Sequence, residues 1–205
     1  MAIDPQGQKM TVEEYFQLDS DPSAKYEYIE GCAIVMSGGS VGHARIAKNI
    51  VHELDNHLKT GPCQAHIFEV KVFIASSTNY FVPDVVVSCH ADDNRADTQA
   101  ISSPCLIMEV LSPSTEARDR GCKFLQYQTL PSLLEYALVS SRYQFVEIYR
   151  RQLDETWSYQ TYRSGQIVRL ESINVELTFA RIYQGIAVPV KPEILKELRA
   201  LYGLS

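Results

Sequence analysis

The sequence has no long hydrophobic run and no closely paired cysteines. None of its apolar stretches approaches the roughly 20 residues that a membrane-spanning helix needs, and no signal-peptide pattern opens the chain. We therefore expect a soluble cytoplasmic protein with no membrane partner. Because no two cysteines are spaced as C-x-x-C, neither a disulfide framework nor a structural zinc site is predicted, and the cysteines are expected to be small buried hydrophobes. They are Cys32, Cys63, Cys89, Cys105 and Cys122.

The sequence also has no excess of positive charge. Its formal net charge is −6, which opposes general attraction to nucleic acid unless a local basic surface or a metal ion offsets the field. With 205 residues, of which 45% are hydrophobic, the chain can build one sizeable core. We expect a loose terminus over 1–9, a single domain over 10–190, and a helix over 191–205 that packs on the domain or on a partner subunit.

The order of the predicted elements indicates an α/β fold, bordering on α+β, with a mixed sheet flanked by helices. Apolar residues at helical spacing predict a helix over 42–59, and Thr11 with Glu14 fits a capping box before a short helix over 12–18. A further helix is expected over 115–130, and a hairpin over 25–36. Strands are expected over 65–74, 81–88, 105–111, 134–140, 144–150, 157–163 and 166–170.

Two of the predicted strands each carry an acidic residue among apolar neighbours. Asp84 lies in FVPDVVVS, and Glu109 lies in LIMEVLS. If the strands 81–88 and 105–111 are antiparallel neighbours, Asp84 near the start of one faces Glu109 near the end of the other, on the same sheet face. The sequence therefore predicts two carboxylates close together at one end of a hairpin.

Two interpretations of these acids remain open. Buried carboxylates at short range repel one another, and a divalent cation such as Mg²⁺ neutralises them directly, with waters and a substrate phosphate completing its coordination. Alternatively, either acid reaches solvent at a strand end or pairs with Arg118 or Arg120. The hairpin relation between Asp84 and Glu109 favours the metal site.

The helix predicted after Glu109 brings a cation to the same end of the sheet. Asp119, Lys123 and Tyr127 follow one another at four-residue intervals and share a helix face. Lys123 could orient a water molecule or stabilise charge on a phosphate oxygen. An exposed and weak ion pair between Asp119 and Lys123 explains the same spacing equally well.

Longer strings of the sequence resemble a known family. The segments KYEYIEGCAIVMSG, VPDVVVS, LIMEVLSPST, DRGCKFLQY and LLEYALVS, with His43, are similar to the Uma-type family of "putative restriction endonucleases", within the PD-(D/E)XK nuclease superfamily, along about residues 10–185. The resemblance implies a restriction-endonuclease-like core with an added N-terminal hairpin. One position departs from the superfamily pattern, because Leu111 stands where a lysine is expected two residues after the acid.

The resemblance also implies which residues form the site. It makes the chain a Mg²⁺-dependent or Mn²⁺-dependent endonuclease acting on DNA, with Asp84 and Glu109 as metal ligands. Lys123 matches a helical lysine of the family and would replace the missing strand lysine. Glu27 and His43 fall at positions that the family pattern marks, and Tyr127 is a further candidate, although an exposed hairpin residue, an ordinary helix-start residue and a packing residue explain them equally well.

Two other functions and one assembly state stay open at the level of sequence. The chain could be a catalytically inactive relative that serves as a binding or interaction module, or a hydrolase of RNA or another phosphodiester. Nucleases often dimerise to cut two strands. The apolar face predicted for the C-terminal helix therefore makes a homodimer an expectation.

Overall fold

The computed structural model describes residues 8–21, 23–36 and 38–190, and its centre is a six-stranded mixed sheet. The strand order in this sheet is β11-β10-β9-β8-β6-β3. Its strands are β3 (Gln64–Ile67), β6 (Val85–Ser88), β8 (Pro104–Leu111), β9 (Glu135–Ser140), β10 (Phe145–Arg151) and β11 (Trp157–Arg163). Strands β8 and β9 are parallel, and the other neighbouring pairs are antiparallel. The mixed α/β sheet predicted from the sequence is therefore confirmed.

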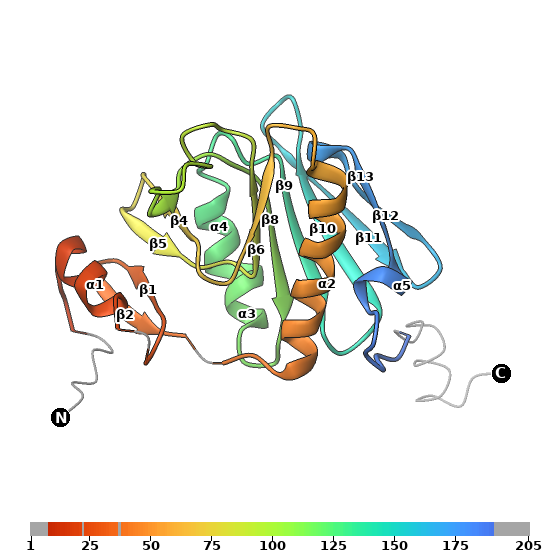
Figure 1. Ribbon diagram of the computed structural model, residues 1–205, viewed down its shortest axis with the longest axis horizontal. Coiled ribbons are helices and arrows are strands. Elements are labelled where there is room, and N and C mark those ends of the chain that lie inside the picture. The colour runs from red at the N-terminus through yellow and green to blue at the C-terminus, as the bar shows by residue number, and fades with distance from the viewer. Residues whose placement is uncertain (1–7, 22, 37, 191–205) are drawn as a thin grey trace.

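One face of this sheet is covered by the long helix α2 (Val41–Leu58), together with α5 (Phe179–Ile182) and the small sheet of β12 (Ile167–Leu170) and β13 (Val175–Thr178) (Figure 1). Ile46, Ile50 and Leu54 of α2 are fully buried against Val85, Val87 and Met108. The four-residue recurrence of apolar side chains along α2 is what produces this buried stripe.

The other face packs against a second sheet and a helical segment. The second sheet has the order β2-β1-β5-β4-β7 and consists of β1 (Tyr26–Ile29), β2 (Cys32–Val35), β4 (Lys71–Ile74), β5 (Asn79–Phe81) and β7 (Ala100–Ile101). The segment joining β8 to β9 runs through α3 (Glu116–Arg118), η1 (Asp119–Lys123) and α4 (Phe124–Tyr127). Because both faces are covered, β6 reads as consecutive valines rather than as an alternating strand.

The N-terminal elements agree with the sequence prediction. Helix α1 (Val12–Asp19) begins at a complete capping box, in which the Thr11 amide donates to Glu14 at 2.7 Å and the Glu14 amide donates to Thr11 Oγ1 at 3.2 Å. Strands β1 and β2 form the predicted hairpin, and its two turn residues, Glu30 and Gly31, both have positive φ angles. Glycine suits such a turn because it has no Cβ to clash.

Two predicted strands were wrong in extent. The segment 65–74 forms β3 and β4, which belong to different sheets, and Phe68 with a φ of 54° turns the chain between them. The segment 81–88 is broken over residues 82–84, since Pro83 has no amide hydrogen for a sheet ladder. A short helix η2 (Glu171–Ile173), together with β7, β13 and α5, was not predicted.

The expectation for the cysteines was also wrong. Cys63 and Cys89 form a disulfide, and the Cys122 side chain is exposed rather than buried. No helix in the described ranges is long and apolar enough to cross a membrane. The predicted C-terminal helix over 191–205 and most of the predicted loose terminus over 1–9 lie outside the described residues.

Candidate active site

The two strand acids meet at one end of β6 and β8, as the sequence predicted. Val85 pairs with Met108 in antiparallel register, so Asp84 and Glu109 are the next pair along the ladder. The Asp84 amide donates to Glu109 Oε2 at 3.3 Å, and the Val110 amide donates to Asp84 Oδ2 at 2.7 Å. Because Asp84 lies in the break after Pro83, its carboxylate stands at the strand end.

Glu109 lies on the face of β8 that is opposite to helix α2. Its neighbours Met108 and Val110 pack in the cluster around α2, so Glu109 points to the other side, toward the helical segment. There Lys123 Nζ donates to Glu109 Oε1 at 2.9 Å, and the Tyr127 hydroxyl donates to the same oxygen at 3.3 Å. Glu109 and Lys123 are only 3% and 5% exposed, which makes this a buried ion pair.

The helical segment is not a regular α-helix where it crosses the site. Residues 119–123 form a π-helix between the short α-helices α3 and α4. A π-helix bonds residue i to i+5 and holds more residues per turn than the 3.6 of an α-helix, so a four-residue step falls short of a full turn in the π segment and overshoots it in the α segment. The two offsets nearly cancel between Asp119 and Tyr127, which keeps Asp119, Lys123 and Tyr127 on one buried face.

Glu27 of the N-terminal hairpin enters the same cluster. Its side chain is 1% exposed, and Oε1 accepts a hydrogen bond from the Val82 amide at 3.0 Å and lies 3.1 Å from Lys123 Nζ. Oε2 pairs with Arg118. The interpretation of Glu27 as an exposed hairpin residue was therefore wrong. In the rest of the article, "the carboxylate cluster" means Glu27, Asp84, Glu109, Asp119, Arg118 and Lys123.

His43 reaches Asp84 from the opposite side of the sheet. It lies in the first turn of α2, where Ser40 caps the helix, and its Nε2 lies 2.8 Å from Asp84 Oδ1. The imidazole is 9% exposed, and its Nδ1 is buried without a hydrogen-bond partner among the described residues. The ring stacks on Phe68 with centroids 6.4 Å apart. His43 is thus more than an ordinary helix-start residue.

A cavity of about 160 Å³ opens beside these groups. Acidic, basic, hydroxyl and apolar side chains all reach it. Its lining includes Met36, Gly38, Gly39, His43, Phe68, Val82, Asp84, Glu109, Ser112, Thr115, Asp119 and Lys123. At about 30 Å³ per water molecule in the liquid, this volume corresponds to about five waters, enough for an ion with a few coordinating oxygens.

The electrostatics of the cluster favour the uptake of a cation. Burial, the largest cause, raises the pKa of Glu109, the Lys123 amine lowers it, and the Asp119 and Asp84 carboxylates raise it, so that the net pKa is about 8. Burial also raises the pKa of Asp119. Burial by itself lowers the pKa of Lys123, but the Glu109 and Asp119 carboxylates outweigh it and the net pKa is raised. Lys123 therefore keeps its charge, and the raised pKa allows Glu109 to take up a proton near neutral pH.

The carboxylates of the cluster suit Mg²⁺, which needs few protein ligands, better than they suit a metal ion that takes all its ligands from the protein. With every acid ionised, the four carboxylates of the cluster exceed Lys123 and Arg118 by two negative charges, which one divalent cation balances. No group of three or more His, Cys, Asp or Glu side chains arranged to hold a metal occurs in residues 8–190 as described. Mg²⁺ requires only one or two carboxylates and fills its other positions with water and substrate oxygens.

Arg118 and Arg120 do not pair with Asp84 or Glu109, contrary to one of the two interpretations above. Arg118 pairs with Glu27, and Arg120 pairs with Glu116 and Glu147. The ion pair between Asp119 and Lys123 exists at 3.6 Å, but it is buried and not exposed. The structure therefore brings together all six residues singled out from the sequence: Glu27, His43, Asp84, Glu109, Lys123 and Tyr127.

Some residues at the site were not identified from the sequence. Ser112 lines the cavity beside Thr115, and their hydroxyl oxygens lie 3.0 Å apart. Phe68 also lines it, although it reads as an ordinary strand residue. The positive φ of Phe68, unusual for an aromatic residue, leaves no mark in the sequence.

Comparison with known proteins shows the family of the chain. Residues 12–182 match the family Uma2, described as "Putative restriction endonuclease". The chain is 39% identical over 179 residues to an uncharacterized protein of Synechocystis sp., slr1290, covering 87% of this chain and 94% of that protein. A second uncharacterized Synechocystis protein, sll1609, is 36% identical over 151 residues, covering 72% of this chain and 84% of that one.

One solved structure has a similar fold. It is the crystal structure of a "putative nuclease belonging to DUF820" from Anabaena variabilis. The TM-score is 0.68 at 20% sequence identity, and the match covers 85% of this chain and 97% of that chain. At this level of identity the comparison establishes the nuclease-like fold of the chain.

Proposed function

This chain belongs to the Uma2 family, and from that premise we propose that it is a Mg²⁺-dependent or Mn²⁺-dependent endonuclease that hydrolyses DNA. The observation that carries the proposal is the meeting of Asp84 and Glu109 at a cavity, with Lys123 Nζ 2.9 Å from Glu109. Two adjacent strands and one helix supply these three groups. A purely structural ion pair would need neither the second carboxylate nor the cavity.

Each residue of the site has a distinct proposed role. Asp84 and Glu109 would hold the cation, which when bound would lower the pKa of a water molecule and offset charge on a phosphate. Lys123 would orient the attacking water or stabilise the charge that develops on a phosphate oxygen, because its buried ammonium stays protonated at the cavity wall. His43 would fix the orientation of Asp84 through its 2.8 Å contact.

The replacement of a strand lysine by Lys123 has a physical explanation in this fold. Leu111 is 4% exposed and packs in the core cluster with Tyr127 and Leu130, so its position has no access to the cavity. The helical segment that follows β8 covers Glu109 and delivers the ammonium from above the sheet. The lysine ammonium thus reaches Glu109 from the helical segment and not from strand β8.

The surface charge predicts weak and salt-sensitive binding of DNA. Arg45 and Lys48 are exposed on helix α2, whereas Arg118 and Arg120 are committed to carboxylates. Arg118 and Arg120 are therefore not available to contact a phosphate. A bound divalent ion would supply most of the attraction for phosphate near the cavity.

The proposal is tested by nuclease assays on the full chain with Mn²⁺ or Mg²⁺. Supercoiled, linear and single-stranded DNA, and RNA, are offered in parallel. We expect cleavage of DNA by the parent and a loss of at least about a hundredfold for Asp84→Asn and for Lys123→Ala, in line with the loss of one electrostatic group at a reaction centre. Cleavage that these changes leave intact would contradict the proposal.

Two results would favour the alternatives left open by the sequence. Faster cleavage of RNA than of any DNA would assign the site to a different phosphodiester. Calorimetric titration with Mn²⁺ addresses the binding module, because equal and negligible heat for the parent and Asp84→Asn would show that the carboxylates serve only to hold Lys123 and Arg118.

A mass of one chain in light scattering would exclude the expected homodimer.

A further inference from the structure

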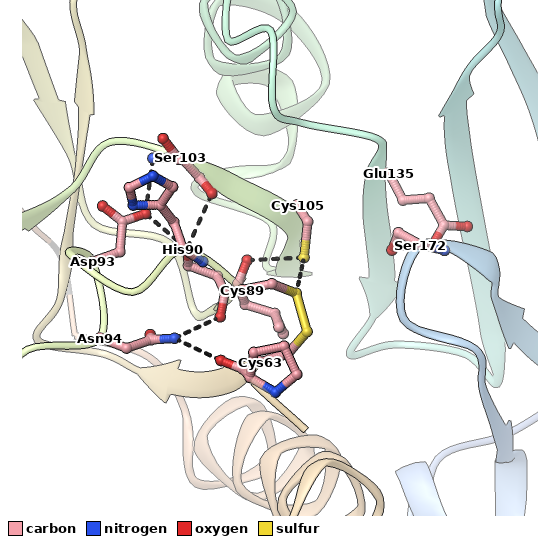
Figure 2. The surroundings of a disulfide bond; sticks show 12 residues. Cys63, Cys89, His90, Asp93, Asn94, Ser103, Cys105, Glu135 and Ser172 are labelled. Atoms are coloured by element: carbon pink, nitrogen blue, oxygen red, sulfur yellow. Dashed lines mark hydrogen bonds between the residues drawn. A yellow bond between two sulfur atoms is a disulfide. The ribbon is translucent and has the colours of Figure 1, made fainter. Parts of the chain in front are cut away.

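Three of the five cysteines meet at the end of the central sheet that is opposite to the carboxylate cluster. Cys63 and Cys89 form a disulfide, and Cys105 Sγ lies 3.5 Å from Cys89 Sγ (Figure 2). In this view the three sulfur atoms follow one another in a row, with Cys89 in the middle. The free thiol of Cys105 is thus in contact with Cys89 Sγ, one of the two sulfur atoms of the disulfide.

The strand register explains this meeting. Gln64 of β3 pairs with Ser88 of β6, so Cys63 and Cys89 are the next opposite residues beyond that pair. Strand β8 lies on the other side of β6 and places Cys105 near its beginning, next to the backbone of Val87, whose oxygen lies 3.4 Å from Cys105 Sγ. Three adjacent strands therefore deliver one cysteine each.

Neighbouring polar groups hold the backbone around the sulfurs. The Asn94 side-chain amide donates to the carbonyl oxygens of Pro62 at 3.1 Å and Ser88 at 3.0 Å. The buried Asp93 carboxylate accepts hydrogen bonds from Ser88 Oγ and from the Ser103 amide. The residues next to Cys63 and Cys89 are thereby fixed, which keeps the sulfurs in contact.

The sulfurs are also open to reagents from solvent. All three cysteine residues are partly exposed, and Cys63 lines a surface hollow of about 300 Å³ beside Leu58 and His66. A small thiol or the active-site loop of a dithiol reductant can approach Cys63 from this hollow.

We propose that Cys63, Cys89 and Cys105 form a thiol–disulfide exchange site. The Cys105 thiolate attacks Cys89 Sγ, a bond forms between Cys89 and Cys105, and the bond between Cys89 and Cys63 breaks. Cys63 leaves as a thiolate and takes up a proton, which balances the proton that Cys105 gives up. The exchange conserves one disulfide and one thiol, so it needs no external oxidant or reductant.

The exchange would move the free thiol from the sheet interior to the surface hollow. Burial raises the pKa of Cys105 to about 11, and the charge of Glu135 adds to this shift. The thiolate of Cys105 is therefore scarce at neutral pH, which makes the exchange slow.

The exchange would also loosen an edge strand that reaches the candidate active site. Strand β3 pairs only with β6 in the central sheet, and the disulfide ties its beginning to that neighbour. The other end of β3 leads to Phe68, which stacks on His43 and lines the cavity. Moving the bond to Cys89 and Cys105 releases the covalent tie on β3.

The test follows the covalent connectivity in the full chain and is independent of nuclease activity. Oxidised protein is held at about pH 9 to raise the thiolate fraction, trapped with iodoacetamide, digested and mapped by mass spectrometry. We expect peptides linking Cys89 to Cys105 to accumulate while alkylation moves from Cys105 to Cys63. The variant Cys105→Ser should keep only the original bond, and Cys122→Ser, which lacks a distant exposed thiol, should behave as the parent.

A second variant reports on the geometry directly. After mild oxidation, folded Cys63→Ser should contain a bond between Cys89 and Cys105. Recovery of both as alkylated thiols, in a variant whose circular dichroism matches the parent, would overturn the proposal. If Cys63→Ser does not fold, the parent decides, because alkylation that stays on Cys105 throughout the incubation at about pH 9 would refute the exchange equally well.

Discussion

Two buried charged clusters lie on the central sheet, and they differ in how completely their groups are satisfied. The second cluster, here the Arg150 cluster, consists of Arg150, Glu135, Gln160, Tyr162 and Ser172. Arg150 Nε donates to Glu135 at 2.6 Å and Nη2 donates to the Tyr162 hydroxyl at 3.0 Å. The other Glu135 oxygen accepts hydrogen bonds from the Ser172 amide and hydroxyl. One cation meets one buried anion, and both carboxylate oxygens are occupied.

The carboxylate cluster has a surplus of negative charge instead. Its four acids face two cations, Glu109 has a raised pKa, and the neighbouring His43 keeps Nδ1 without a partner in the described part of the chain. Uncompensated buried charge is costly, and perturbed titration of this kind is concentrated at functional sites. The comparison supports the proposal that the carboxylate cluster binds a ligand, whereas the groups of the Arg150 cluster are satisfied within the fold.

Cavity size alone would have pointed to the wrong cluster. The hollow beside Glu135 and Arg150 has a volume of about 470 Å³, against about 160 Å³ beside Asp84 and Glu109. The chemistry of the lining decides between them. The smaller cavity has three acids, an ammonium and an imidazole whose Nδ1 has no partner among the described residues, whereas the charged groups of the larger one already bind one another.

The largest expected effect is on the free energy of unfolding, and it comes from removing Arg150, the cation of the Arg150 cluster. Arg150→Met leaves Glu135 buried without its partner, and we expect the free energy of unfolding to fall by about 3–5 kcal/mol. Lys123→Met should cost less at neutral pH, because Glu109 with its raised pKa can take up a proton. Urea unfolding of the parent and both variants measures the difference, and equal losses would remove the contrast between the two clusters.

The next effect is the pH dependence of metal binding. The pKa of Glu109 is raised to about 8, so the carboxyl is protonated below that pH and must lose the proton before it binds a cation. The affinity for Mn²⁺ should therefore rise by up to about tenfold per pH unit toward pH 8 and level off above it. Calorimetry in buffers of different ionisation enthalpy also measures how many protons are released when Mn²⁺ binds.

Glu109→Gln is the control for this pH dependence. The amide has no titratable proton, so the variant should bind Mn²⁺ weakly with little change below pH 8. Arg150→Met, if it folds at the temperature used, should keep the slope of the parent. A slope that persists in Glu109→Gln would assign the proton to another group of the cluster.

The sequence predicted the meeting of Asp84, Glu109 and Lys123 because their positions follow from local rules of strand pairing and helix spacing. A polar loop joins two short strands, so antiparallel pairing follows, and alternation then places Asp84 opposite Glu109. The spacing of Asp119, Lys123 and Tyr127 gave the correct shared face, although the π turn that preserves it has no known mark in the sequence. Pro83 did signal the break before β6, but the strand was still predicted as continuous.

Features that depend on distant contacts could not be predicted in this way. Glu27 and Arg118 are 91 residues apart, and neither the burial of Glu27 nor its pairing has a local pattern. The bond between Cys63 and Cys89 spans 26 residues and follows only from the register of β3 against β6, which the sequence left open. The turn at Phe68 that separates β3 from β4 belongs to the same class of long-range effects.

A smaller effect is expected from the glycine loop that covers His43. A Cβ atom added at Gly39 would lie 2.9 Å from His43 Cδ2, whereas one at Gly38 would meet nothing within 4 Å. Gly39→Ala should displace the imidazole from Asp84 and weaken Mn²⁺ binding by about tenfold, the lower end of the range for groups that orient a metal ligand. Gly38→Ala is the matched control and should bind as the parent does. Equal affinities for both variants would show that His43 does not orient Asp84.

The smallest effect distinguishes Tyr127, which lies beside the carboxylate cluster, from Tyr162 of the Arg150 cluster. The Tyr127 hydroxyl donates to Glu109 at 3.3 Å, while its ring packs against Phe81 with centroids 5.5 Å apart. Tyr127→Phe keeps the packing and removes one donor to the ionised carboxyl, so the pKa of Glu109 should rise by less than about one unit and carry the midpoint of Mn²⁺ binding with it. Tyr162→Phe removes a hydroxyl that accepts from Arg150, and it should lower the free energy of unfolding by about 1 kcal/mol while leaving that midpoint unchanged. Titration of both variants at several pH values separates the two clusters, because a shifted midpoint in Tyr162→Phe would mean that they are electrostatically coupled through the sheet.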